Sequence, residues 1–275
     1  MSLIDAKAFK TALIIGAALS VGAALPAEAR HGSVQARHAA RSQASPGIGL
    51  PAVTATAAVV DPARSAANRA LDEGRMPAAV LDFAGIKAGD VIADYQAGGG
   101  YYSELLASMT GPRGRVYAMT QVEGYKPEAW APLTARHANL LPLVAGGAAL
   151  QLAPGSVDTI FTNLVYHDLY FTSVKYAHPR LEVPEILAGW FAAVRPGGHV
   201  IVIDHIGPAG DPREVVEKFH RIDPATVKAA MTAAGFVLEA ESDVLRRSED
   251  THEKNVFDPA IRGKTDRMML KFRRT

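Results

Sequence analysis

From Asp61 onward, short strand-like runs alternate with segments whose apolar residues have helical spacing, and this alternation restricts the fold most. Strands that alternate with helices pack as a mostly parallel sheet with helices on both faces, so the pattern predicts an α/β fold. No internal repeat is evident, which favours one globular unit. The expected strands span residues 91–94, 115–119, 140–144, 157–162, 199–204, 236–242 and 267–273, and the expected helices span 65–75, 78–84, 101–109, 126–137, 184–194 and 224–235.

The first 29 residues have the pattern of a secretory signal peptide. Two lysines precede an apolar run over residues 11–25, which ends at the cleavage pattern Ala27-Glu28-Ala29. A buried helix would carry polar residues on one face, and a membrane span would need roughly 20 apolar residues. We therefore predict residues 1–29 to be a signal peptide. The mature protein would be periplasmic or secreted, without stable membrane association.

A second segment, residues 30–60, is rich in Ala, Ser, Gly and Gln, and it has no acidic residue. No aromatic residue occurs between Phe9 and Phe83. Such a stretch buries too little apolar surface to offset the entropy lost on ordering. We predict a disordered linker over 30–60 and a folded domain over 61–275.

Composition excludes several classes of function. Lys and Arg number 29 against 28 for Asp and Glu, a net charge of +1, so no overall field draws the protein onto nucleic acid. The chain has no cysteine, which removes thiol nucleophiles, thiolate zinc sites and disulfides. Its chemistry must come from His, Asp, Glu, Tyr, Asn or a bound cofactor.

A glycine cluster, Gly98-Gly99-Gly100, stands between the expected strand ending at Asp94 and the helix that opens at Tyr101. This order places free backbone N–H groups at a helix N-terminus, beside a cleft at the carboxyl end of the sheet. Glycine suits such a turn because it lacks a Cβ and adopts positive φ readily. The cluster predicts a loop on which a ligand lies against the backbone.

Several motifs occur together in a familiar order. They are the run 90–102, the Ser156-Val157-Asp158 strand entry, the Arg195-Pro196-Gly197-Gly198 turn and the terminal strand. In this order they resemble class I S-adenosylmethionine-dependent methyltransferases, which implies a Rossmann-like, seven-stranded, mostly parallel sheet whose last strand is antiparallel. Further motifs resemble a little-characterised bacterial family of predicted methyltransferases, many with export signals. These are residues 97–102, Tyr166-His167-Asp168, 255–259 and 264–267.

The resemblance implies a set of residues around S-adenosylmethionine. Gln96 takes the place of the family's first loop glycine, where its side chain would narrow the pocket or bond to the cofactor. Thr120 replaces the acid that usually ends the second strand, and Gly146 replaces the acid near the adenine. The candidate cofactor-binding residues are Asp94, Gln96, Ala97, Gly98, Gly99, Gly100, Tyr102, Thr120 and Asn163.

The run after the fourth strand supplies candidate catalytic residues. In the implied fold, Tyr166, His167 and Asp168 face the point of methyl transfer. A transferred methyl group needs an oriented acceptor and a place for the departing proton, and His titrates near neutral pH. Polar loops at 220–223 and 255–262 are candidates for the acceptor pocket, with a solvated connector as the alternative.

We predict no metal site. Asp204-His205, at the end of the fifth strand, makes at most a pair with His167. A closed zinc site needs three or four converging ligands, and no HExxH spacing is present.

The functional prediction is methyl transfer from S-adenosylmethionine to an unknown small-molecule acceptor. The alternative is a noncatalytic exported binding protein whose cofactor contacts have decayed, as the residues at 96, 120 and 146 suggest. An NAD(P)-dependent oxidoreductase is disfavoured, because no acid ends the second strand and no Tyr-x-x-x-Lys pair is suitably placed.

Overall fold

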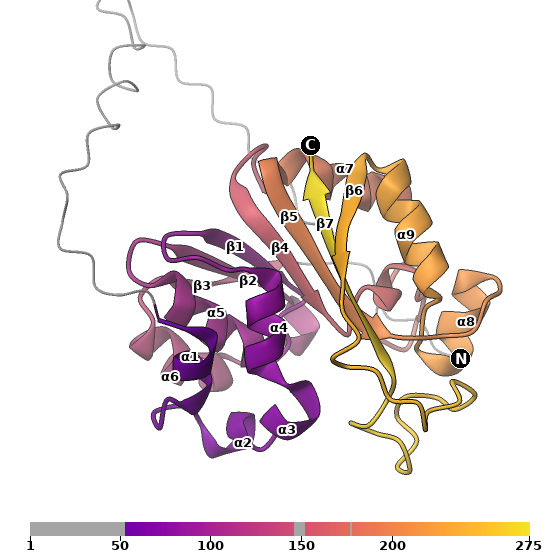
Figure 1. Cartoon of the computed structure of the whole chain (residues 1–275), viewed down its shortest axis with the longest axis horizontal. Coiled ribbons are helices and arrows are strands. Elements are labelled where there is room, and N and C mark those ends of the chain that lie inside the picture. Colours follow the sequence, from indigo (N-terminus) through magenta and orange to yellow (C-terminus); the bar gives the residue numbers. More distant parts are fainter. Residues whose placement is uncertain (1–52, 146–151, 177) are drawn as a thin grey trace, which may run out of the picture. The chain divides into compact units, whose positions relative to one another are not determined.

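Seven strands form one sheet within residues 53–145, 152–176 and 178–275, which are the residues that the computed structural model describes. The order is β3-β2-β1-β4-β5-β7-β6, and β7 runs antiparallel to both of its neighbours, β5 and β6 (Figure 1). The predicted fold class is confirmed. The strands are β1 Val91–Tyr95, β2 Arg115–Gln121, β3 Leu140–Ala145, β4 Val157–Asn163, β5 Val194–His205, β6 Phe236–Glu241 and β7 Arg267–Arg274.

Helices cover both faces of the sheet, and each face has its own buried apolar cluster. One cluster joins the sheet to α1, α4, α5 and α6, and the other joins it to α7, α8 and α9. The helices are α1 Ala55–Val60, α2 Ala66–Arg69, α3 Asp72–Arg75, α4 Pro77–Ala84, α5 Tyr101–Thr110, α6 Pro127–Arg136, α7 Val183–Ala193, α8 Pro212–Phe219 and α9 Pro224–Ala233, with short 3₁₀ turns at Val122–Gly124 and His167–Leu169.

Helix α1 lies inside the segment that we predicted to be linker. Thr54 caps it by accepting a hydrogen bond from the Ala57 N–H, and Ala55 and Ala58 are buried against the domain. Alanine packs closely without an aromatic partner, so a low content of large apolar residues does not exclude docking here. The ordered domain therefore includes residues before Asp61.

Three other elements differ from the predicted pattern. Strand β5 begins at Val194 and so includes the residues 195–198 that were predicted to be a turn. The helix expected over 65–75 is two short helices, and Met76 then adopts a left-handed conformation with φ 46°. Helix α8 was not predicted, although Asp211 caps it and Pro212 occupies its first turn, both of which are start signals for a helix. Pro142 sits in β3, an edge strand, where a missing N–H donor is tolerated.

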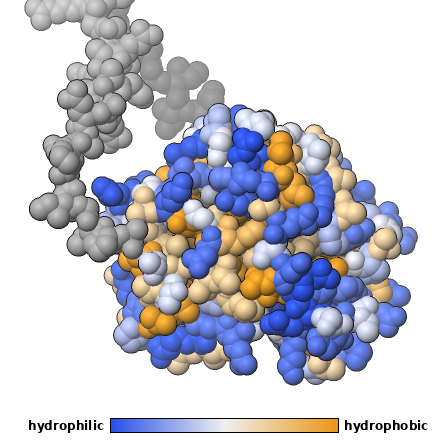
Figure 2. Space-filling view, viewed as in Figure 1, coloured by the Kyte–Doolittle hydropathy of each residue, from blue (hydrophilic) through white to orange (hydrophobic). Residues whose placement is uncertain are grey.

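The predicted signal peptide, most of the predicted linker and Gly146 lie outside the described residues. Among the residues that are described, no helix is long and apolar enough to cross a membrane. On the face shown in Figure 2, hydrophobic residues gather in the middle and hydrophilic residues surround them.

Candidate functional site

The loop between β1 and α5 turns sharply at the carboxyl end of the sheet. Gln96, Gly98 and Gly100 all have left-handed backbone conformations, with φ of 52°, 55° and 80°. The Ala97 N–H donates to the Met119 carbonyl at 2.7 Å, which ties the loop to the end of β2. The predicted glycine-rich turn is therefore present, and a glutamine occupies one of its three left-handed positions.

A cavity of about 250 Å³ opens above this loop. An ideal Cβ built on Gly98 or on Gly99 meets no protein atom within 4 Å, so the backbone there faces open space. The cavity brings together seven of the nine predicted cofactor-binding residues. It is lined by Asn68, Leu71, Arg75, Asp94, Tyr95, Gln96, Ala97, Gly98, Gly99, Tyr101, Tyr102, Asn163 and Val165.

Asp94 forms the acidic part of the cavity wall. Asp94 is 3% exposed, and its carboxylate accepts a hydrogen bond of 2.5 Å from the Ser103 hydroxyl on α5. Burial outweighs this hydrogen bond and raises the pKa of Asp94 to about 7. The cavity therefore has a carboxyl group whose ionised form is incompletely compensated by the Ser103 hydrogen bond, and a cationic ligand would complete the compensation.

Gln96 contributes a second polar group. Its side-chain Nε2 is buried and has no hydrogen-bond partner among the described residues. A buried amide donor without a partner is unfavourable by about 1 to 3 kcal/mol. A ligand with an acceptor atom in the cavity would satisfy it.

Gly100 serves a different purpose from Gly98. It caps α5, and a Cβ at this position would lie 2.6 Å from Leu133 Cδ1 and 3.1 Å from the Trp130 ring on α6. Gly100 and Thr120 are the two predicted cofactor-binding residues that do not line the cavity. The glycine at position 100 lets helix α6 pack against the loop.

We expect Gly100→Ala to lower the free energy of unfolding by about 2 to 4 kcal/mol, because overpacking adds to the strain of a positive φ. Chemical denaturation measures this change. Gly111→Ala is the matched control, since Gly111 also has positive φ, 63°, with nothing within 4 Å of its Cβ position. Equal losses in the two variants would contradict the packing role.

Among the cavity residues that were not predicted, Asn68, Leu71 and Arg75 come from a distant segment, the one that forms α2 and α3. The Arg75 guanidinium lies 4.2 Å from the centre of the Tyr101 ring, and the Tyr101 hydroxyl donates to Asp72 at 2.6 Å. The cavity thus has a cation, Arg75, as well as the acid Asp94. No local motif marks these residues, because tertiary packing brings their helices over the loop.

The three candidate catalytic residues occupy different environments. Tyr166 is fully buried in the apolar cluster below α7, with its ring 6.0 Å from that of Trp190. His167 is 4% exposed, and Asp168 is partly exposed beside it. The His167 Nε2 atom lies 3.4 Å from Asp168 Oδ1. Only His167 and Asp168 therefore present reactive atoms to each other.

Asp204 holds His167 in place. The carboxylate accepts hydrogen bonds from the His167 backbone N–H at 2.7 Å and from the ring Nδ1 at 2.8 Å. Burial disfavours the imidazolium, but the charge and hydrogen bond of Asp204 outweigh burial and raise the pKa of His167 to about 9. Asp204, from the end of β5, is thus the partner that orients the ring, and Asp168 is not.

Two more histidines lie near His167. The ring centres of His220 and His205 are 5.7 Å and 6.0 Å from that of His167. Burial, reinforced by the charge of His167, lowers the pKa of His220 to about 4. Burial also lowers the pKa of His205 to about 3, and its Nδ1 atom lies 2.7 Å from Thr265 Oγ1.

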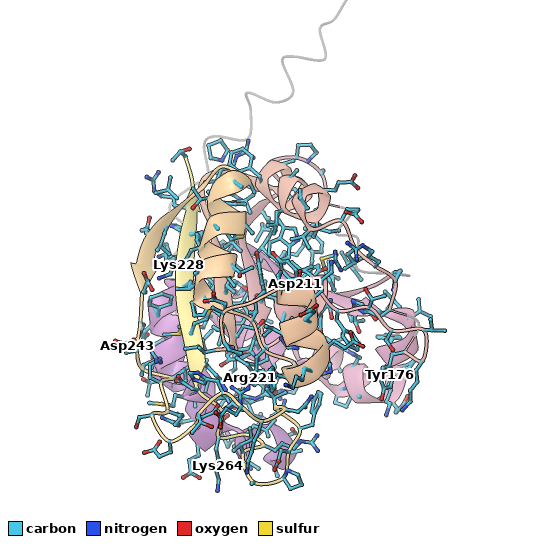
Figure 3. All side chains as sticks on the ribbon, turned by 90° about the vertical axis from the view of Figure 1, so that its right-hand side faces the viewer. Tyr176, Asp211, Arg221, Lys228, Asp243 and Lys264 are labelled. Atoms are coloured by element: carbon cyan, nitrogen blue, oxygen red, sulfur yellow. The ribbon has the colours of Figure 1, made fainter. Side chains whose placement is uncertain are left out.

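Arg221, from the polar loop that we predicted as an acceptor pocket, has a structural role instead. It is fully buried, and its guanidinium contacts Asp250 at 2.8 Å and the Ile206 carbonyl at 3.0 Å. In Figure 3 it lies between helix α8 and the C-terminal loop that carries Lys264. The ion pair fixes the chain next to His220.

Comparison with solved structures agrees with this architecture. The chain is similar to a SAM-dependent methyltransferase from Aquifex aeolicus, with a TM-score of 0.50 and 21% identity over 70% of this chain and 87% of that one. It is similar to a methyltransferase from Mesorhizobium loti, with a TM-score of 0.52 and 16% identity over 74% of this chain and 100% of that one. A third similar structure is that of a putative sarcosine dimethylglycine methyltransferase from Galdieria sulphuraria. Its TM-score is 0.51, with 12% identity over 76% of this chain and 88% of that one.

The chain has the fold of class I S-adenosylmethionine-dependent methyltransferases. No model of a known protein family matches the sequence. No curated protein matches it either.

Proposed function

We propose that the protein transfers a methyl group from S-adenosylmethionine to a small-molecule acceptor. The observation that carries the proposal is the cavity at the carboxyl end of β1, where Gly98 and Gly99 face open space and two opposite charges line the wall. In open α/β sheets, ligands bind in this crevice. Methyltransferases of the same fold support the choice of cofactor.

The polar groups of the cavity fit the amino-acid end of this cofactor. Its ammonium group would lie against the buried carboxylate of Asp94, and its carboxylate against the guanidinium of Arg75. The amide of Gln96 supplies a donor that has no partner among the described residues. The cofactor supplies an activated methyl group, and these residues hold and orient it.

We place the acceptor near His167 and Asp168. Val165, two residues before His167, lines the cavity, so the two regions are adjacent. Orientation of the acceptor supplies much of the rate in such a transfer. Tyr166 supports this wall from the core, because its side chain is fully buried.

The noncatalytic alternative was based on departures from the family pattern at residues 96, 120 and 146. The two of these that the structure describes, Gln96 and Thr120, do not favour it. Gln96 keeps the left-handed backbone that glycine would supply, and its amide is available to a ligand. Thr120 lies outside the cavity lining. Two of the three departures from the family pattern are therefore compatible with binding.

Calorimetric titration of the purified protein with S-adenosylmethionine and S-adenosylhomocysteine tests the proposal. We expect one site of micromolar affinity, since the cavity offers both charges and backbone contacts. Arg75→Gln should weaken binding by roughly 10-fold or more, as expected on losing a charged hydrogen bond. Arg69→Gln, on the same pair of helices but not lining the cavity, is the matched control.

Absence of binding to either compound would overturn the proposal.

Measurements of the rate of methyl transfer distinguish residues of the acceptor region from residues of the cofactor cavity. Once an acceptor is known, Asp168→Asn should reduce methyl transfer and leave the affinity for S-adenosylhomocysteine unchanged.

A further inference from the structure

Two histidines and one carboxylate converge beside the cavity. His167, Asp168 and His220 each offer one ligand atom, and these atoms all lie within 4.8 Å of one another. Two ligands at about 2.1 Å from a tetrahedral metal ion lie about 3.4 Å apart. The separation of His167 Nε2 from Asp168 Oδ1 is 3.4 Å, so this pair already has the required spacing.

The ring of His167 is oriented as a metal-binding histidine is. Its Nδ1 atom bonds to the Asp204 carboxylate at 2.8 Å, and the other oxygen of Asp204 accepts the His167 backbone N–H. Histidines that bind metals almost always use their second nitrogen in this way, because a carboxylate fixes the ring and strengthens the ligand. The remaining nitrogen, Nε2, points toward Asp168 and is the one free to bind an ion.

His220 is held by rings on both sides. It ends helix α8 with φ 50°, and its ring centre lies 4.8 Å from that of Phe171 and 5.0 Å from that of Phe257. The next residue, Arg221, is anchored by its buried ion pair with Asp250. The third ligand is therefore placed by packing rather than by a flexible loop.

We propose that His167, Asp168 and His220 bind one divalent transition-metal ion, with Asp204 as the group that orients His167. Two imidazoles and one carboxylate suit ions such as Zn²⁺, Fe²⁺ or Co²⁺, whereas Mg²⁺ and Ca²⁺ prefer oxygen ligands. Three protein ligands leave at least one position open to an oxygen or nitrogen of another molecule. The site replaces our sequence-based prediction of no metal, and it does not depend on the proposed methyl transfer.

Metal binding to the full chain tests the site directly. Protein stripped with a chelator is titrated with Zn²⁺ by calorimetry, and with Co²⁺ by visible absorption, which reports coordination. We expect the parent to bind one metal ion per chain tightly. The affinity should fall by at least about 100-fold in Asp168→Asn and in His220→Asn, since each variant loses a direct ligand. Asparagine keeps the shape of Asp168 and tolerates the positive φ at position 220.

His199→Asn is the matched control. His199 is partly buried at the start of the regular pairing of β5, where its Nε2 contacts Glu239 at 3.3 Å. We expect parent-like binding in this variant. Thermal unfolding without metal should be similar in all variants, whereas added Zn²⁺ should stabilise only the parent and the control. No tight binding in the parent, or equal binding in the parent and both cluster variants, would overturn the site.

Discussion

Asp94→Asn is expected to weaken cofactor binding by roughly 10- to 150-fold and, at the same time, to stabilise the unliganded protein at pH 8. Binding falls because the neutral amide no longer attracts the cofactor's ammonium group. Stability rises because the buried carboxylate at position 94 is ionised at this pH and has one hydrogen bond from Ser103. Asp94→Asn is therefore expected to lower the affinity for the cofactor and to raise the free energy of unfolding at pH 8.

The raised pKa of Asp94 determines in which direction the stability changes with pH. A carboxyl group whose pKa is raised in the folded state stabilises the fold below its unfolded pKa and loses that contribution as the pH rises. Burial raises the pKa of Asp94 from 3.8 to about 7, so its contribution is lost over that window. Between pH 5 and pH 8 the parent should lose roughly 3 kcal/mol relative to Asp94→Asn.

Denaturant unfolding at both pH values, with calorimetry at pH 8, measures the two effects. Asp90→Asn is the control, since burial also raises the pKa of Asp90 but this residue does not line the cavity. It should leave cofactor affinity unchanged. A destabilised Asp94→Asn protein at pH 8 would show that the carboxylate is needed for the fold itself.

Gly98→Asn is expected to reduce cofactor binding below detection while the protein remains folded. Asparagine tolerates the left-handed conformation at φ 55°, so backbone strain is small. Its side chain would project into the open space above the loop, where the ligand would lie. A β-branched residue would be a poorer choice, because it resists positive φ.

The control for this substitution is Gly155→Asn. Gly155 has φ 60° and open space at its Cβ position, but it precedes β4 at the amino end of the sheet. The two variants should unfold at similar temperatures and differ in binding. If Gly98→Asn binds S-adenosylhomocysteine like the parent, the ligand does not lie on this loop.

Much of the fold could be predicted from the sequence because its signals are local. Glycine and proline mark most of the turns, and apolar runs of strand length mark all seven strands, although β5 begins at Val194, before the glycine-proline run that was predicted to precede it. Helix α1 could not be recognised, because its buried surface consists of alanines whose partners lie far along the chain. The break at Met76 also depends on tertiary packing more than on local preference.

The site divides in the same way. The loop from Asp94 to Gly99 is contiguous, so its residues could be assigned together. Arg75, Asp204 and His220 come from three other segments. The implied fold already paired Asp204 with His167 and placed the 220–223 loop at the acceptor pocket, whereas nothing in the sequence connected Arg75 to the cavity. Asp168 is adjacent to His167 in the sequence, but adjacency does not specify which group orients the ring, and the hydrogen bond to its Nδ1 comes from Asp204 on the neighbouring strand. Such contacts follow from strand order, which local patterns do not specify.

The position of β7 has a consequence for how the chain folds. This strand, Arg267–Arg274, is inserted between β5 and β6, and it pairs with both of them. During synthesis, β6 has no partner in the sheet until β7 has been made. Because such late, non-local pairing is slow and leaves strand edges exposed, the nascent chain remains open to aggregation until β7 has paired. A chaperone that covers β5 and β6 would therefore act mainly before β7 is in place.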